Sequence, residues 1–172
     1  EHLQRKEPVL RRALDHLLRR IDGGLDARLA LDQFRSIRQD VVMQQVPAPF
    51  AAEVYLAGAR FAVGHGYIGE FNVCQTQLLD VLHACSTEVQ AEVHAARLLY
   101  LAVTAQHSEH GAALQQLADE DVLQHPAVRR ARGATRALTL GLPGRFFSAL
   151  CAPESPPLLR SLAAACRQYV VV

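Results

Sequence analysis

Two small groups of residues could bind a metal ion. His107 and His110 stand three residues apart, and Cys74, His83 and Cys85 lie close together in the sequence. Imidazole nitrogens and thiolates are the usual ligands of zinc. No carboxylate or thiol completes a ligand set around the two histidines, and the cysteines fall among apolar residues. We therefore interpret the histidines as solvent-facing helix residues and the cysteines as core residues, and we expect neither a metal ion nor a cofactor.

The sequence also lacks the common catalytic motifs. It contains no Gly-x-Ser-x-Gly, no P-loop and no His-Glu-x-x-His, which are typical of serine hydrolases, nucleotide-binding enzymes and metallopeptidases. We expect a protein that is not an enzyme, with no catalytic residue and no small-molecule substrate.

A group of arginines follows Pro126 and is the strongest candidate for contact with nucleic acid. Because a helix brings residues three and four apart to one side, arginines at this spacing could follow a row of phosphates. The alternative is a solvated face whose charge is countered by Glu120 and Asp121. The net charge of the chain is only +1, so any RNA contact must be local. The candidate residues are Arg129, Arg130, Arg132 and Arg136.

Arg38 is a charged residue that we expect to lie beside apolar residues. It falls beside the apolar stripe of an expected helix that contains Phe34. A guanidinium held against a core is costly unless it is paired, so we expect a carboxylate from a neighbouring helix, either Glu53 or Glu70. The pair is either structural or, together with Asp40, part of a partner-binding surface.

Three amide side chains stand on a later stretch that is otherwise rich in apolar residues. On this stretch, apolar residues recur at spacings of three and four, which indicates a helix. We expect the amides to join helices through side-chain hydrogen bonds. They are Asn72, Gln75 and Gln77.

Helices must position all of these residues. Leu, Ala and Arg dominate, aromatic residues make up 6% and Trp is absent, a composition typical of packed helices. Asp26 and Ser155 have the residue type and position of N-caps, and Asp119 to Asp121 read as an acidic turn. The periodicity predicts helices near 8–21, 27–45, 50–63, 69–83, 87–106, 108–117, 126–140, 145–150 and 158–167.

The expected helices recur at an even interval. Every second helix begins near residue 8, 49, 87 or 126, a period of about 40, as in stacked helical hairpins. The sequence therefore predicts an all-α chain of stacked hairpins, a TPR-like α-solenoid, with an irregular helical bundle as the alternative. We expect residues 1–172 to form one domain.

The rest of the sequence contains few further signals. The four cysteines form no C-x-x-C pair, so we expect reduced thiols. The longest apolar run, residues 98–105, is too short to span a membrane. The chain opens at Glu1 without a Met and ends at Val172, and we expect it to be a piece of a longer protein.

Three segments in the first half of the chain resemble the SAC/GANP family. Family members carry a Ser-Ile-Arg-Gln-Asp segment, a Val-Tyr-x-x-x-Ala-Arg segment and an Asn-x-Cys-Gln-Thr-Gln-Leu segment in this order. The residues of these segments are most similar to those of the leukocyte receptor cluster member 8 branch of the family. The matching residues are 34–40, 53–60 and 70–78, with weaker similarity at 9–14, 125–128, 136–138 and 145–147.

This resemblance implies a nuclear, non-enzymatic scaffold. In the family, helical repeats lead into a winged helix to form a PCI-type module, and the winged helix would follow the present residues. The implied partners are a second PCI-domain protein and a small acidic subunit, in complexes that link transcription, mRNA processing and mRNA export. Direct RNA binding by the arginines that follow Pro126 is the alternative function.

Overall fold

Ten α-helices and two short 3-10 helices make up the part of the chain that the structure describes, residues 7–117 and 119–170. The structure is a computed structural model. No strand occurs within those residues, so the all-α prediction is confirmed. The helices fall into two compact units, residues 1–84 and 85–172, and each unit is described below by itself.

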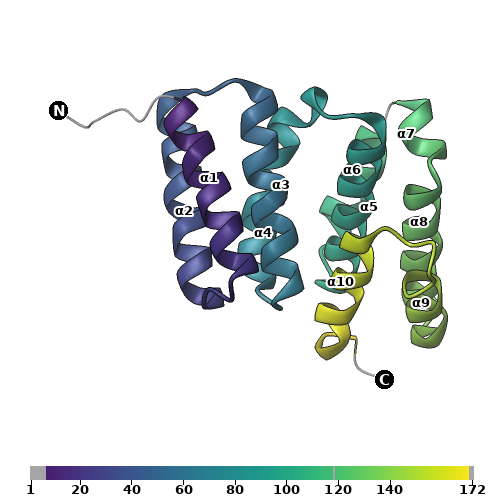
Figure 1. Cartoon of the computed structure of the whole chain (residues 1–172). Coiled ribbons are helices and arrows are strands. Elements are labelled where there is room, and N and C mark those ends of the chain that lie inside the picture. The colour runs from purple at the N-terminus through teal and green to yellow at the C-terminus, as the bar shows by residue number, and fades with distance from the viewer. Residues whose placement is uncertain (1–6, 118, 171–172) are drawn as a thin grey trace. The chain divides into compact units, whose positions relative to one another are not determined.

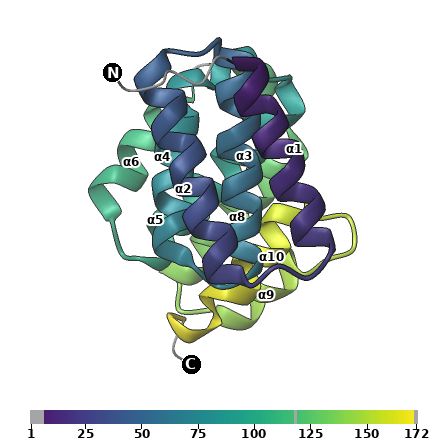
Figure 2. The ribbon, with the colours of Figure 1, turned by 60° about the vertical axis from the view of Figure 1, so that its left-hand side comes forward.

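The first unit contains two helical hairpins in series. The helices are α1 (Glu7–Asp22), α2 (Ala27–Gln44), α3 (Ala48–Gly64) and α4 (Ile68–Val81), followed by the 3-10 helix η1 (Leu82–Ala84). Consecutive helices run antiparallel, as Figure 1 shows, and α1, α2 and α3 lie side by side in Figure 2 as well. Helix α2 packs on α1 and α3, and the closest packing in the unit joins α3 to α4.

Local signals in the sequence explain where these helices begin and end. The predicted N-cap of α2 is confirmed, since the Asp26 carboxylate accepts hydrogen bonds from the backbone of Arg28 and Leu29 at 3.0 and 3.2 Å. Gln45 ends α2 in the left-handed conformation, with φ of 47°, and Pro47 then precedes α3.

A glycine allows the close packing of α3 on α4. A Cβ added to Gly58 would lie 3.1 Å from the Cys74 sulfur and 3.6 Å from the ring of Phe34. Phe34 and Cys74 are themselves almost fully buried. The absence of a side chain at Gly58 therefore allows α4 to approach α3 closely.

The second unit is built around α5. Its helices are α5 (Thr87–Val103), α6 (His107–Gln116), α7 (Glu120–Gln124), α8 (Pro126–Thr139), α9 (Pro143–Leu150) and α10 (Pro157–Ala165), followed by η2 (Cys166–Gln168). Helix α5 contacts α6, α7, α8 and α10, and residues on all of its sides are buried. A helix without a polar face is expected in such a position.

Two local predictions in this unit are wrong. The acidic stretch after residue 118 forms a helix, α7, in which the Asp119 carboxylate caps the backbone of Asp121 and Val122. Ser155 does not cap α10; it is buried, and its hydroxyl donates to the carbonyl of Ala149.

The N-terminus of α10 is capped from another helix. The backbone N–H of Leu158 donates to the Glu92 carboxylate of α5 at 3.3 Å. A carboxylate at a helix N-terminus is favourable for the same reasons as a local cap. Because the two residues are 66 positions apart, no sequence pattern near Ser155 could have indicated this contact.

Candidate functional site

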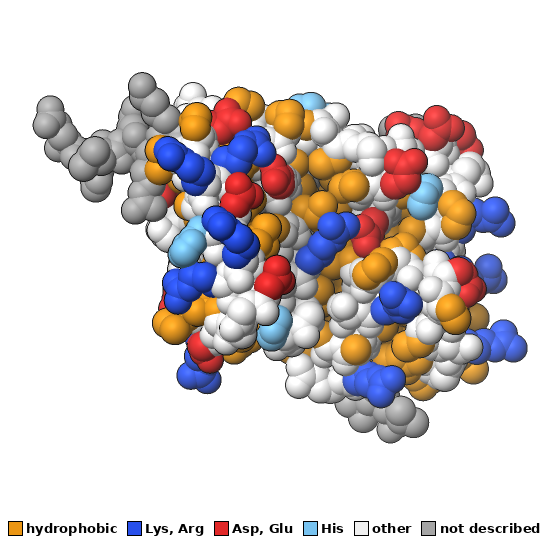
Figure 3. Space-filling model, viewed as in Figure 1, with side chains coloured by type: hydrophobic (Ala, Val, Ile, Leu, Met, Phe, Trp, Pro, Cys, Tyr) orange, Lys and Arg blue, Asp and Glu red, His pale blue; other side chains and the backbone are white. Residues whose placement is uncertain are grey.

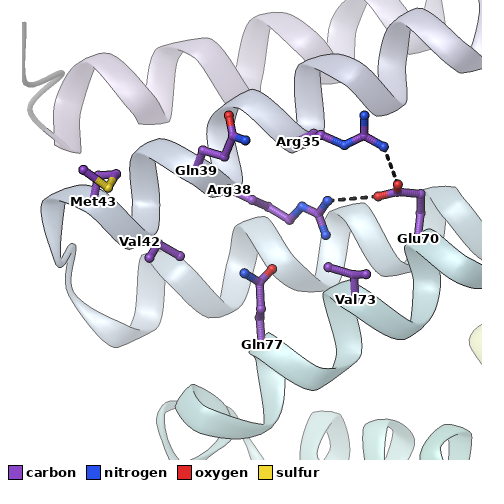
Figure 4. Close-up of a pocket in the computed structure, with 8 residues that line it drawn as sticks. All are labelled: Arg35, Arg38, Gln39, Val42, Met43, Glu70, Val73 and Gln77. Atoms are coloured by element: carbon purple, nitrogen blue, oxygen red, sulfur yellow. Dashed lines mark hydrogen bonds and ion pairs between the residues drawn. The ribbon is translucent and has the colours of Figure 1, made fainter. Parts of the chain in front are cut away.

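A buried ion pair joins the two helices that carry the polar motifs. Arg38 of α2 donates from Nη2 to the Glu70 carboxylate of α4 at 2.9 Å and from Nη1 to the Cys74 sulfur at 3.1 Å. Arg35 donates to the other carboxylate oxygen of Glu70. Figure 4 shows both guanidinium groups converging on this one carboxylate. The predicted partner Glu70 is confirmed, whereas Glu53 instead accepts from Arg11 at 2.9 Å.

The charges of this cluster stabilise one another. The Arg38 side chain is only 6% exposed. Burial opposes ionisation of Glu70, but the hydrogen bonds and charges of Arg35 and Arg38 outweigh burial, so the pKa of Glu70 lies below its usual value. Burial raises the pKa of the Cys74 thiol, and the opposing effect of Arg38 is smaller. Cys74 is therefore a protonated, buried hydrogen-bond acceptor and not a reactive thiol.

An open groove of about 440 Å³ lies beside the ion pair, between α2 and α4 (Figure 4). Three apolar side chains at the groove are exposed, Val42, Met43 and Val73. We did not predict them from the sequence, although apolar residues outside the buried stripe of a helix are the signal for such a surface. The lining residues are Arg35, Arg38, Gln39, Val42 and Met43 from α2, and Glu70, Val73 and Gln77 from α4.

The three predicted amides, Asn72, Gln75 and Gln77, all lie on α4. Gln75 donates to Asn72 at 3.3 Å, and both residues belong to α4. Among the residues that the structure describes, the Gln77 carbonyl oxygen is buried without a hydrogen-bond partner. Arg38 therefore connects α2 to α4, and Gln75 and Asn72 bond within one helix. Asp40 is half-buried on α2 and does not line the groove.

The arginines of α8 divide into two kinds. Arg129, Arg132 and Arg136 are exposed, and none of them forms an ion pair with a residue in the described ranges. Arg130 is half-buried, lies 3.3 Å from the Glu154 carboxylate and donates to the carbonyl of Ala149 at 3.1 Å. Figure 3 shows basic side chains spaced along the edge of the unit where α8 lies.

The acidic residues expected to counter these arginines, Glu120 and Asp121, form no ion pair with them within the described residues. Glu120 accepts from Gln124 at 2.8 Å, and Asp121 lies in the capped first turn of α7. The exposed arginines of α8 therefore keep their charge available to a ligand.

The two histidines lie near α8. His107 is exposed and His110 is half-buried, and both line a cavity of about 340 Å³ with Thr135 and Thr139. Burial lowers the pKa of His110, and the charge of His107 lowers it further. Within residues 7–117 and 119–170, no group of three or more His, Cys, Asp or Glu side chains could hold a metal ion.

Comparison with known proteins shows which family the chain is part of. It is 34% identical over 140 residues to the THP3 homolog of Schizosaccharomyces pombe, which covers 81% of this chain and 35% of the relative. It is 32% identical over 143 residues to a leukocyte receptor cluster member 8 homolog of Xenopus laevis, covering 83% of this chain and 18% of the relative. The chain belongs to the SAC3/THP3 family. The resemblance to the SAC/GANP family is thereby confirmed.

A third relative agrees with this assignment. SAC3 family protein A of Arabidopsis thaliana is 33% identical over 148 residues, covering 83% of this chain and 14% of the relative. No protein-family model matches the chain, and no solved structure matches it. The chain spans about a third or less of the length of these relatives. Their names state no catalytic activity.

Helix composition adds one further observation. None of the described helices is both long and apolar enough to cross a membrane.

Proposed function

We propose that this chain is part of a non-enzymatic scaffold subunit in a nuclear complex that links transcription, mRNA processing and mRNA export. Membership of the SAC3/THP3 family supports this role. The observation that carries the proposal is the groove between α2 and α4. Arg35, Arg38 and Glu70 of these two helices are used in an internal ion-pair cluster, and the surface next to them presents exposed apolar residues. This arrangement suits binding of a protein better than catalysis.

The expected partners are a second PCI-domain protein and a small acidic subunit. In this proposal the helices of the chain lead into a winged helix, and the two parts together form a PCI-type module. The helical part supplies rigid docking surfaces, and the winged helix supplies further contacts with the partner.

Co-purification tests the scaffold. The chain, extended through the expected winged helix, is co-expressed with a candidate PCI-domain partner and a small acidic subunit. The molar mass of the product is measured by light scattering after gel filtration. A stoichiometric complex supports the proposal. If the extended chain is folded and stays alone, the proposed function is wrong.

A second candidate function is direct RNA binding by α8, since Arg129, Arg132 and Arg136 are exposed and unpaired within the described residues. Its test is the anisotropy of a labelled single-stranded RNA on the wild-type chain and on the Arg129→Glu, Arg132→Glu double variant. Binding through these residues weakens steeply with salt and is lost in the variant.

The matched control changes the same number of charges elsewhere. Arg19 and Arg20 are exposed on α1, so Arg19→Glu with Arg20→Glu alters net charge equally. If both double variants weaken RNA binding equally, or if neither does, the α8 candidate is wrong in its named residues.

A further inference from the structure

The groove between α2 and α4 has apolar side chains on both of its sides. Met43 is 75% exposed and Val42 is 54% exposed on α2, and Val73 is 46% exposed on α4. Figure 4 shows Val42 and Val73 on the two helices that border the groove. Exposed apolar residues that line one concave surface, rather than standing singly, mark sites of interaction.

The groove also has an excess of positive charge. Its lining contains two guanidinium groups, Arg35 and Arg38, and one carboxylate, Glu70. Asp32 lies outside the lining, 3.4 Å from Arg35 in a pair whose side chains are both more than half exposed, and such a pair is weak. Arg35 can therefore exchange its contact with Asp32 for a carboxylate from another molecule.

Two buried polar atoms at the groove, one on each of its two helices, lack partners. The Nε atom of Arg38 and the Oε1 atom of Gln77 make no hydrogen bond to any residue that the structure describes. Arg38 is almost fully buried, and leaving such a donor unpaired is unfavourable. One is a donor and the other an acceptor, which is the complement of an amide group.

We propose that this groove binds an acidic, amphipathic segment of a partner protein. The segment inserts a bulky apolar side chain between Val42, Met43 and Val73 and places a carboxylate against Arg35. An amide of the segment satisfies Arg38 and Gln77 after a small side-chain shift. The inference rests on the proposed scaffold function and adds the chemistry of one docking site.

The lining favours a protein over RNA as the occupant. It contains no aromatic residue on which a base could stack. Recognition of single-stranded RNA relies on such stacking. An apolar anchor flanked by carboxylates matches the exposed apolar residues and the charge of the groove together.

The test is selection from a displayed library of random 16-residue peptides, with the wild-type chain as the target. The strongest selected peptide is then synthesised with a fluorescent label, and its dissociation constant is measured by anisotropy. The proposal expects selected peptides to be enriched in a bulky apolar residue flanked by Asp or Glu. No enrichment, or enrichment in basic residues, overturns it.

Matched variants then locate the site. Val42→Gln and Leu29→Gln change two residues of α2 that are each 54% exposed, and Leu29 does not line the groove. We expect Val42→Gln and Val73→Gln each to weaken peptide binding by about tenfold, a loss typical of a central anchor, and Leu29→Gln to leave it unchanged. Equal effects of Val42→Gln and Leu29→Gln contradict the proposal. Circular dichroism confirms that each variant is folded.

A charge exchange provides a test of the polar contact. Arg35→Glu weakens binding of the acidic peptide, and replacing the acidic residues of the peptide with Lys restores it. Failure of this rescue overturns the assigned role of Arg35. Self-association of the chain that Val42→Gln abolishes, without peptide binding, would assign the groove to a second copy and contradict the proposal.

Failure of this inference can be distinguished from failure of the proposed function. If the complex with the PCI-domain partner forms while no peptide binds the groove, the scaffold stands and the docking site is wrong. If peptides bind the groove while the complex does not form, the docking site stands and the proposed assembly is wrong.

Discussion

The arginines of α2 and α8 are used in opposite ways. Arg38 of α2 is 6% exposed and donates to Glu70 and Cys74. Arg129 and Arg132 of α8 are exposed and have no ion pair within the described residues. Both helices have an apolar stripe and both carry arginines at helical spacing, so the difference comes from what the neighbouring helix offers.

The neighbouring helix determines whether an arginine is buried or exposed, because a buried guanidinium needs a fixed partner. Helix α4 places Glu70 opposite Arg35 and Arg38, whereas α5, which packs on α8, faces it with apolar residues. An arginine on α8 therefore points outward to water unless another segment supplies an acceptor, as Ala149 of α9 and Glu154 do for Arg130. Arg38 of α2 therefore contributes to stability, whereas the charges of Arg129, Arg132 and Arg136 on α8 remain exposed to solvent.

The largest effect is expected when Glu70 loses its charge. Glu70→Gln leaves the Arg38 guanidinium buried without a counter-charge, and we expect the free energy of unfolding to fall by about 3 kcal/mol. Urea unfolding followed by circular dichroism measures the change. The matched control is Glu154→Gln, since Glu154 pairs with Arg130 but is largely exposed, and there we expect no measurable change. Equal losses of unfolding free energy in the two variants would contradict the view that the buried ion pair stabilises the fold more than the exposed one.

A glycine substitution tests the packing around the same ion pair. The side chain of Gly58→Val would meet the Cys74 sulfur that accepts from Arg38, and overpacking of this kind costs about 2 kcal/mol. Gly133→Val on α8 has no heavy atom within 4 Å of its Cβ, so we expect a change within about 0.5 kcal/mol. Thermal unfolding of both variants measures the two changes in stability. An unchanged stability of Gly58→Val would show that α3 and α4 pack less closely than described.

Low pH should also weaken the ion pair, with a smaller loss of stability than the substitutions cause. Because the pKa of Glu70 is lowered in the folded chain, its contribution to stability is fully present above the unfolded value of about 4.5 and is lost as the pH falls through the folded value. Urea unfolding at a series of pH values from 7 to 3 should show a steeper loss for the wild type than for Glu70→Gln. Parallel curves would mean that Glu70 does not carry the stabilising charge.

Much of the fold follows from local patterns in the sequence. Apolar periodicity and helix-breaking residues predicted that helices begin near residues 49, 87 and 126, and the structure has helices starting at Ala48, Thr87 and Pro126. Asp26 was identified as a cap because its acceptor lies next to the N–H groups that it caps. These features depend on residues within one or two turns of each other.

Contacts between distant residues could not be predicted in the same way. The sequence left Glu53 and Glu70 as equal partners for Arg38, because the choice depends on how helices pack. The cap that Glu92 provides for α10 and the groove residues Val42, Met43 and Val73 also depend on tertiary packing. Whether Glu120 and Asp121 counter the charge of the α8 arginines was left open for the same reason.

In the function proposed above, this chain binds proteins and does not need its α8 arginines for that binding. The most direct measurement is the affinity of the extended chain for a PCI-domain partner, for the wild type and for Arg129→Glu with Arg132→Glu, at about 50 and 200 mM salt. We expect the same affinity for both proteins and a shallow dependence on salt. Loss of partner binding in the variant, together with a steep dependence on salt, would contradict it.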